Sequence, residues 1–253
     1  MIRVILNGCN GKMGRVLVRM LEAQKDMEIV AGIDRETDRY ENSFPVYADI
    51  FSCSEKGDVL IDFSHPSTIS NTLNYCQKSN VPIVTATTGL SGKDTAHFLE
   101  ASKFIPIFQS SNMSLGISIV IDIAAQAAKT LGDSFDIEII EKHHNKKVDS
   151  PSGTAFMIAD GINKTFEHRK EYIYGRHGNE DVRSENQIGI HAVRGGTIFG
   201  EHTVIFAGSD EIIEIKHTAL SKDIFAAGAI NAARFIIQQK NGYYNMHDLL
   251  KEA

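Results

Sequence analysis

Apolar residues recur along this chain with two different periods. Through the first half, short apolar runs of strand length alternate with stretches whose apolar residues have helical spacing. Near-continuous apolar strands separated by helices predict a parallel sheet covered on both faces. The expected strands are 2–6, 28–33, 59–63, 81–85 and 105–109, and the expected helices lie around 16–21, 67–78 and 93–101.

The pattern changes beyond Ser114. A long helical stretch reaches about Leu131, and a strand over 136–141 and a helix over 154–166 follow. Three strands without helices between them then predict an open mixed sheet, at 187–193, 202–207 and 211–217. Between these parts, the polar residues 167–186 predict a long exposed or partner-contacting loop, and a last helix is expected over 224–240. The fold class is therefore α/β, a Rossmann-type doubly wound sheet plus a smaller α+β part.

Composition narrows the protein class. The 253 residues are 42% hydrophobic and 23% charged, which is typical of a soluble globular protein. A net charge of -6 argues against a general nucleic-acid or membrane-surface binder, because both need a basic field. Three cysteines without CxxC spacing fit a reducing compartment, and the strand pattern from Ile2 leaves no room for a signal peptide. Asp122 and Gln126 interrupt the most apolar stretch, so we expect a cytoplasmic protein without a membrane span.

A glycine-rich turn follows the first predicted strand. Gly8, Gly11 and Gly14 have the spacing G-x-x-G-x-x-G, and a helical pattern comes next. This strand, turn and helix context predicts a dinucleotide site, where small residues let the backbone approach a pyrophosphate. Asp34 follows the second strand, 20 residues after Gly14, where an acid can bind the ribose hydroxyls. Its neighbour Arg35 either binds a 2′-phosphate or is a solvated loop residue.

Small and polar residues follow three further predicted strands. In a doubly wound sheet, ligands bind beyond the carboxyl ends of the strands. These loops are 64–66, 86–89 and 110–113. Each could be a plain turn, but together with the glycine loop they predict a cofactor trough.

The most distinctive stretch is 141–155, EKHHNKKVDSPSGTA. Its four cations, His143, His144, Lys146 and Lys147, lead into a predicted helix start, whose free amides and dipole favour an anion. Histidine and lysine together offer a proton and a fixed charge. The alternative is a solvated basic loop with an ordinary helix cap. No metal is expected, because the spacing is not His-Glu-x-x-His.

These residues resemble the dihydrodipicolinate reductase family, also called 4-hydroxy-tetrahydrodipicolinate reductases, over essentially the whole chain. The stretch 141–155 carries the most specific match. Supporting motifs are Gly8-x-x-Gly11-x-Met13-Gly14, Ile61-Asp62-Phe63, Thr87-Thr88-Gly89, Ser111-Asn112-Met113-Ser114-x-Gly116, Arg194-Gly195-Gly196 and Gly200-Glu201-His202.

The resemblance implies a nucleotide domain of residues 1–112 and 221–253, and a substrate-binding and tetramerisation domain of 113–220. It implies NADH- or NADPH-dependent reduction of a small cyclic dicarboxylate in lysine and diaminopimelate biosynthesis, by a homotetramer. His143 resembles the family's proton donor/acceptor and Lys147 its proton donor, while His144, Gly153 and Thr154 resemble its substrate contacts. The implied cofactor contacts are Gly8, Cys9, Asn10, Gly11, Lys12, Met13, Asp34, Arg35, Ala86, Thr87, Thr88, Ser110, Ser111, Asn112 and Met113.

Three features depart from the family pattern. Asp34 stands where a glutamate is common, the connection from Asp34 to Pro45 is short, and Lys222 occupies a position where arginine is expected. The first two leave the cofactor preference open. Two other functions fit these residues less well. A nucleotide-sensing regulator would not need the His-Lys loop, and a semialdehyde dehydrogenase would need a thiolate near a histidine.

Overall fold

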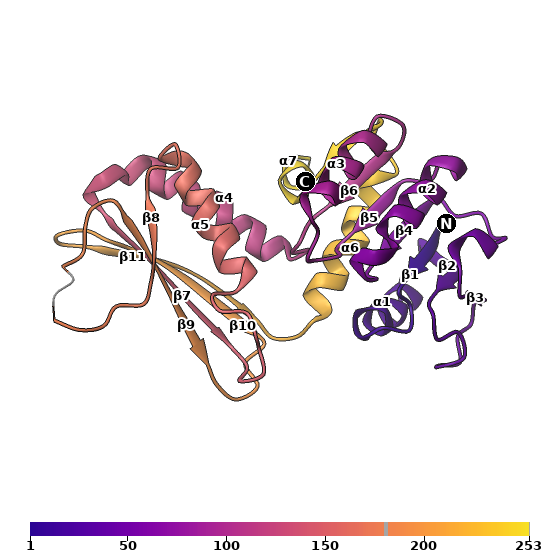
Figure 1. The fold of residues 1–253 in the computed structure, drawn as a ribbon, viewed down its shortest axis with the longest axis horizontal. Helices are drawn as coiled ribbons and strands as arrows, with labels where there is room; N and C mark the ends of the chain where they lie inside the picture. The colour runs from indigo at the N-terminus through magenta and orange to yellow at the C-terminus, as the bar shows by residue number, and fades with distance from the viewer. Residues whose placement is uncertain (180–181, 253) are drawn as a thin grey trace. The chain divides into compact units, whose positions relative to one another are not determined.

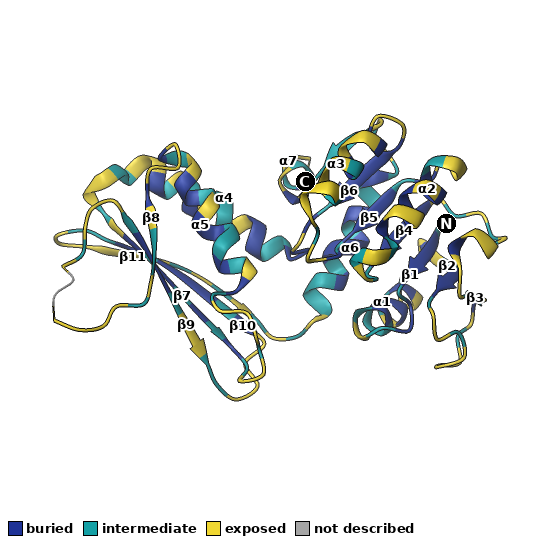
Figure 2. Ribbon diagram, viewed as in Figure 1, coloured by how far each residue is buried: buried dark blue, intermediate teal, exposed yellow. Residues whose placement is uncertain are grey.

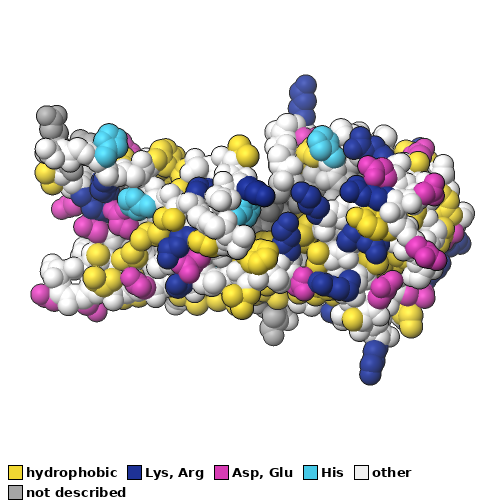
Figure 3. Space-filling model, turned by 90° about the horizontal axis from the view of Figure 1, so that it is seen from below, with side chains coloured by type: hydrophobic (Ala, Val, Ile, Leu, Met, Phe, Trp, Pro, Cys, Tyr) yellow, Lys and Arg dark blue, Asp and Glu magenta, His cyan; other side chains and the backbone are white. Residues whose placement is uncertain are grey.

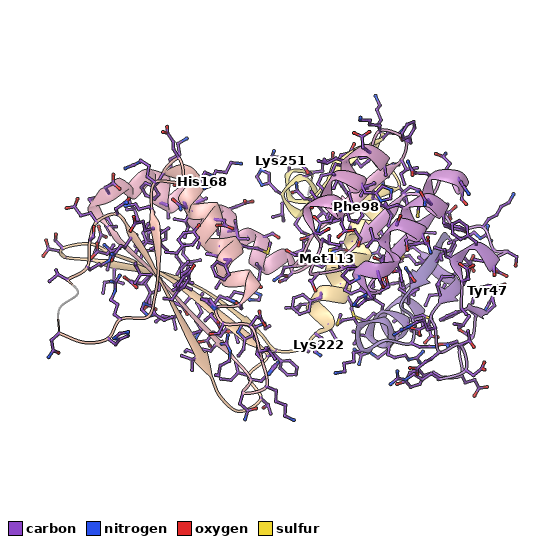
Figure 4. The ribbon with its side chains drawn as sticks, in the orientation of Figure 1. Tyr47, Phe98, Met113, His168, Lys222 and Lys251 are labelled. Carbon is purple, nitrogen blue, oxygen red and sulfur yellow. The ribbon has the colours of Figure 1, made fainter. Side chains whose placement is uncertain are left out.

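The computed structural model describes residues 1–179 and 182–252. The chain divides into two compact units, residues 1–115 with 222–253, and residues 116–221 (Figure 1). Figure 4 labels Met113 and Lys222, which lie close to the two points where the chain passes from one unit to the other. The first unit therefore contains both ends of the chain.

A seven-stranded parallel sheet forms the first unit. Its strand order is β12-β6-β5-β4-β1-β2-β3, so six strands repeat the 3-2-1-4-5-6 order of a dinucleotide-binding sheet. Its elements are β1 (Ile2–Asn7), α1 (Lys12–Glu22), β2 (Met27–Ile33), β3 (Val46–Tyr47), η1 (Ile50–Ser52), β4 (Val59–Asp62), η2 (Pro66–Thr68), α2 (Ile69–Ser79), β5 (Ile83–Thr85), α3 (Gly92–Ala101), β6 (Pro106–Gln109), α6 (Asp223–Ile236), β12 (Gly242–Tyr244) and α7 (Met246–Lys251).

Alternate residues of each strand enter two separate cores. Val4 and Leu6 of β1 pack with α1 and α6, whereas Ile5 between them packs with α2 and α3. All three are fully buried, and Figure 2 shows the central strands buried between partly exposed helices. Burial on both faces explains why these strands have near-continuous apolar sequences.

The second unit is a five-stranded mixed sheet with helices on one face. Its strand order is β11-β10-β7-β9-β8, with parallel pairs around β9 and antiparallel pairs around β10. Helices α4 and α5 pack on Ile137 and Ile139, and they are the only α-helices among the described residues of this unit. The elements are α4 (Leu115–Leu131), η3 (Gly132–Ser134), β7 (Asp136–His143), α5 (Gly153–Thr165), β8 (Glu171–Tyr174), β9 (Gln187–Arg194), β10 (Gly200–Ala207) and β11 (Ile212–Ala219).

The fold class is confirmed, but several local predictions were wrong. Residues 167–186 are not one long loop, because Glu171–Tyr174 forms β8 and pairs with β9. The last long helix ends at Ile236 rather than near 240, and Gly242 begins β12 instead of a terminal loop. The short strands β3 and β12 and the helix α7 were also missed. β3 has only two residues and β12 three, and the six residues of α7 make less than two helical turns, so none of them shows a clear hydrophobic period.

Helix α4 is more apolar than the sequence pattern suggested. With η3 it spans Leu115–Ser134, which is long and apolar enough to cross a membrane by length and composition alone. Asp122 lies in its middle, while Val120, Ala124 and Ala128 pack into the core of the second unit. One apolar helix of this kind is also typical of the core of a soluble protein.

Candidate active site

The glycine loop between β1 and α1 has no room for larger residues at two positions. Gly8 has a φ of +83°, and a Cβ there would lie 2.7 Å from the Phe63 carbonyl oxygen of β4's loop. At Gly14, a Cβ would lie 2.0 Å from the Gly8 carbonyl oxygen. The first glycine therefore permits the turn, and the last lets α1 begin close beneath it.

Asp34 organises the loop opposite these glycines. Its two carboxylate oxygens accept hydrogen bonds from the backbone amides of Asn10, at 3.0 Å, and Glu36, at 3.1 Å. The Asn10 side-chain amide donates to the Glu36 carbonyl at 2.7 Å. An ionised carboxylate has about four acceptor positions. Asp34 can therefore still accept hydrogen bonds from ribose hydroxyls.

A cavity of about 420 Å³ lies between the glycine loop and the ends of β2 and β4. Five predicted cofactor residues line it: Gly8, Asn10, Gly11, Asp34 and Arg35. This is the point where the strand order reverses, which is where a doubly wound sheet binds its nucleotide. The glycine cradle and the acid at its side fit a nicotinamide dinucleotide.

The cavity also has walls that sequence reasoning missed. Ser67 and Thr68 of η2 and Glu36 and Arg39 of the loop after β2 line it. The strand-end rule pointed to 64–66 but not to the short helix that follows. Arg39 pairs with Glu36 at 3.2 Å, and both side chains are at least half exposed. The face of the first unit seen in Figure 3 carries Lys and Arg interspersed with Asp and Glu, so the field there is not of one sign.

The other predicted cofactor residues do not line this cavity. Cys9 and Met113 are buried in the core of the first unit, with Met13 packed against it. Burial raises the pKa of the Cys9 thiol to about 11, with the Asp34 charge adding to the shift. Thr88, Ser111 and Lys12 are exposed, Ala86 is half-buried, and Ser110 donates its hydroxyl to the Asn112 carbonyl at 2.7 Å.

A buried carboxyl joins the ends of β1, β4 and β5. Asp62 is fully buried and accepts from Asn7 Nδ2 at 2.8 Å, Thr85 Oγ1 at 3.0 Å and Thr87 Oγ1 at 2.8 Å, besides Ser64. Desolvation raises the pKa of Asp62 although these hydrogen bonds oppose it. The Thr87 side chain therefore points toward Asp62. The same carboxyl also binds the side chains of Asn7, Ser64 and Thr85.

In the second unit, Glu141 on β7 is the centre of a polar cluster. It is fully buried and forms a bidentate pair with Arg194 of β9, both N–O distances being 2.7 Å. It also accepts from His143 Nδ1 at 2.6 Å and from the Ser152 amide at 2.9 Å. Burial would raise the pKa of Glu141, but the bonds from His143, Arg194 and Ser152 outweigh it and lower the pKa to about 2. Glu141 is therefore a carboxylate at neutral pH.

The predicted proton donor His143 ends β7 and is 8% exposed. Its Nδ1 is held by Glu141, and a Cβ at Gly200 would lie 3.1 Å from its Nε2. The ring of His202 packs edge-on at 5.2 Å between centroids, and His202 Nε2 lies 3.1 Å from Ser152 Oγ. Burial and the nearby His143 charge lower the pKa of His202 to about 3. His202 is therefore a neutral neighbour of His143.

The loop after β7 places Lys147 beside the start of α5. Lys147 Nζ lies 2.9 Å from Asp149 Oδ1, and the nearby Gly153 amide contributes to the lowered pKa of Asp149. Partial burial raises the pKa of Asp149, but these contacts lower it overall. The buried His144 Nδ1 has no hydrogen-bond partner. An internal carboxylate thus already pairs with Lys147, one of the predicted anion-binding groups.

The helix α5 begins at Gly153, one residue before the start that the sequence predicted. Ser152 is the N-cap, and its hydroxyl accepts from the Ala155 amide at 3.2 Å. Gly153 is exposed, Thr154 is half-buried, and nothing lies within 4 Å of a Cβ built at Gly153. The cationic loop therefore leads directly into the N-terminus of α5, as the hypothesis of an anion-binding site requires.

Comparison with known families shows what these two sites belong to. The family "Dihydrodipicolinate reductase, N-terminus" matches residues 2–113, and "Dihydrodipicolinate reductase, C-terminus" matches residues 116–250. The chain belongs to the dihydrodipicolinate reductase family. Together the two matches cover nearly all of the chain, so each of the two units matches a domain of this family.

Curated relatives and solved structures agree with this family. The 4-hydroxy-tetrahydrodipicolinate reductase of Caldanaerobacter subterraneus subsp. tengcongensis is 52% identical over 253 residues and 100% of both chains. That of Clostridium tetani is 49% identical over 250 residues, covering 99% of this chain and 97% of the relative. A dipicolinate-bound dihydrodipicolinate reductase from a Paenisporosarcina species superposes with a TM-score of 0.81 at 25% identity, covering 96% and 98% of the chains.

Proposed function

We propose that this chain catalyses the reduction of (2S,4S)-4-hydroxy-tetrahydrodipicolinate to (S)-tetrahydrodipicolinate with NADH or NADPH, in lysine and diaminopimelate biosynthesis. One substrate, one reduced nicotinamide and one proton give one product, one oxidised nicotinamide and one water. The observation that carries the proposal is the buried Glu141–His143 pair, whose loop leads into the start of α5. Relatives that match the chain from end to end have this activity in their names.

The assay that tests the proposal couples the chain to the synthase that makes the unstable substrate. Absorbance at the nicotinamide band is then followed with each cofactor. We expect stoichiometric oxidation of the reduced nicotinamide. Cofactor binding without oxidation would support the nucleotide-sensing alternative and overturn the proposal.

Residues 1–112 and 221–253 are proposed as the nucleotide-binding domain. The cradle of Gly8 and Gly11 would hold the pyrophosphate, because their backbone can approach it closely. Asp34 would bind the ribose hydroxyls and Arg35 a 2′-phosphate. The bound nicotinamide supplies the hydride.

Residues 113–220 are proposed as the substrate domain. A substrate carboxylate would replace Asp149 beside Lys147, and it would also meet the Gly153 amide, Thr154 and His144. The pair between Lys147 and Asp149 supports this role, because Lys147 already binds a carboxylate at this position. The dipicolinate-bound relative supports a cyclic dicarboxylate as the substrate class.

His143 and Lys147 are proposed as the acids of the reaction. Reduction increases electron density at the ring nitrogen, and the hydroxyl must leave as water, so positioned protons are needed. His143 can exchange a proton only at Nε2, because Nδ1 is held by Glu141. Lys147 Nζ is only 2.9 Å from Asp149, so it lies beside the proposed carboxylate position.

A homotetramer in the cytoplasm is proposed as the working form. The face of the five-stranded sheet opposite α4 and α5 carries Val193 and Ile212, which are 44% and 67% exposed. The two α-helices of the described part of this unit, α4 and α5, both pack on the opposite face. Sheet packing between copies of the chain would bury these side chains.

Arg35→Ala is expected to weaken the binding of NADPH more than the binding of NADH. Removing the guanidinium takes away a charged partner of the 2′-phosphate, whereas NADH has only hydroxyls there. Dissociation constants measured by nicotinamide fluorescence should show the NADPH value rising at least ~10-fold, since a hydrogen bond to a charged group contributes roughly 1.5–3 kcal/mol. Arg39→Ala, on the same cavity wall, is the comparison variant. Equal losses for the two cofactors in Arg35→Ala would remove Arg35 from the phosphate site.

Pyridine-2,6-dicarboxylate should inhibit more strongly than pyridine-2-carboxylate. The second carboxylate would gain charged hydrogen bonds at the start of α5, and one such bond contributes roughly 1.5–3 kcal/mol. We therefore expect inhibition constants that differ by more than ~5-fold, measured against the cyclic substrate. Indistinguishable inhibition constants would contradict the proposed carboxylate-binding site.

A further inference from the structure

Glu141 contacts two functional parts of the second unit with its two oxygens. Oε2 accepts from His143 Nδ1 at 2.6 Å, and Oε1 accepts from the Ser152 amide at 2.9 Å. Ser152 is the N-cap of α5, so its amide fixes where that helix begins. The proposed proton-transfer residue and the proposed carboxylate site are therefore attached to one fully buried side chain.

Arg194 holds this carboxylate in one orientation. Its Nη1 and Nη2 each donate to a different oxygen of Glu141, and Nη2 also donates to the Asp149 carbonyl at 2.8 Å. A bidentate guanidinium pair fixes the plane of the carboxylate as well as its position. Glu141 cannot rotate away from His143 without losing both bonds.

An ionised carboxylate has only acceptors, so it selects the histidine tautomer. The neutral ring of His143 must carry its hydrogen on Nδ1, which leaves Nε2 free to accept or, when the ring is charged, to donate. The Nε2 side is next to Gly200, which contributes no side chain. Orientation by a buried acid is the same physical device that sets the tautomer of the histidine in serine proteases.

We propose that Glu141 is a positioning residue for proton transfer, which fixes the tautomer of His143 and its separation from the start of α5. The inference rests on the proposed role of His143. Arg194 acts through Glu141 and touches neither reactant in this scheme.

The chain contains its own matched control on the same strand. Glu138, also on β7, lies 2.6 Å from His191 Nε2 and pairs with Arg176 and Arg183, but on the opposite face of the sheet. Glu138→Gln makes the same chemical change beside a histidine and arginines. It should leave kcat unchanged, provided that light scattering gives the same mass as wild type.

The decisive variant is Glu141→Gln. The amide keeps the size of the side chain, and its oxygen can still accept from Ser152 or Arg194, but its NH2 group no longer requires a hydrogen on Nδ1. We expect kcat to fall ~10²-fold or more, because positioned proton transfer contributes that much, with the KM of the cofactor unchanged. Normal kcat at saturating substrate in a folded variant would overturn the inference.

A second measurement does not depend on activity or on the folding of a variant. Long-range proton–nitrogen NMR of imidazole-labelled wild-type protein, recorded above the titration of the ring, distinguishes the two tautomers, and His143→Gln identifies the signal. We expect the hydrogen on Nδ1. A hydrogen on Nε2 would overturn the inference. If His143→Gln itself keeps normal kcat, the proposed role of His143 fails instead, whichever tautomer is found.

Discussion

Replacing His143 with glutamine, or Lys147 with methionine, is expected to lower kcat by well over tenfold without changing cofactor affinity. Each substitution removes an exchangeable proton at the proposed substrate site, and general acid catalysis typically contributes ~10²–10⁴ in rate. The cofactor cavity belongs to the other unit, so nicotinamide binding should be unaffected. Steady-state kinetics gives kcat and KM, and fluorescence titration gives the dissociation constant of the cofactor.

Two neighbouring residues make this test specific. Lys146 is exposed and lies next to Lys147, so Lys146→Met changes the same charge in the same loop and should keep normal kcat. His144→Gln should mainly raise the KM of the substrate, because loss of binding common to ground and transition states leaves kcat intact. A raised KM with near-normal kcat in His143→Gln or Lys147→Met would assign that residue to binding rather than chemistry.

Gly14→Ala is expected to damage the nucleotide unit more than any other single methyl group in the glycine loop. The new Cβ would lie 2.0 Å from the Gly8 carbonyl oxygen and 2.6 Å from that of Cys9, and both are backbone atoms. The loop or α1 must move, which costs ~1–3 kcal/mol in overpacked sites. Displacement of the backbone amides should also weaken the binding of NADH and NADPH at least ~10-fold, because a helix N-terminus binds phosphate through backbone donors in fixed positions.

The free energy of unfolding in urea and the cofactor dissociation constants measure these two effects. Gly92→Ala is the control, because nothing lies within 4 Å of a Cβ built there and Gly92 begins α3 in the same unit. It should be neutral or slightly stabilising. A Gly14→Ala protein with wild-type stability and cofactor affinity would show that the helix does not need its close approach to the loop.

The architecture could be predicted from the sequence, and so could the positions of the glycine loop and the His-Lys loop. Strands buried on both faces, such as β1, require apolar residues at successive positions, and helices require a period near 3.6, so both leave readable patterns. The glycines at positions 8 and 14 are readable for a similar reason, because only glycine fits the space left by Phe63 and by the loop itself. The cluster from His143 to Thr154 was visible because it is contiguous.

Contacts between residues far apart in the sequence could not be predicted and are defined by the folded chain. Arg194 follows Glu141 by 53 residues, and His202 is 50 residues from Ser152, yet parallel and antiparallel registers place each pair in contact. Strand pairing is non-local, so no period or spacing along the chain reveals it. For the same reason, the orientation of Thr87 toward Asp62 and the burial of Met113 became clear only from the packed strands. Local periodicity encodes the elements, whereas the geometry of the site comes from sheet register and burial.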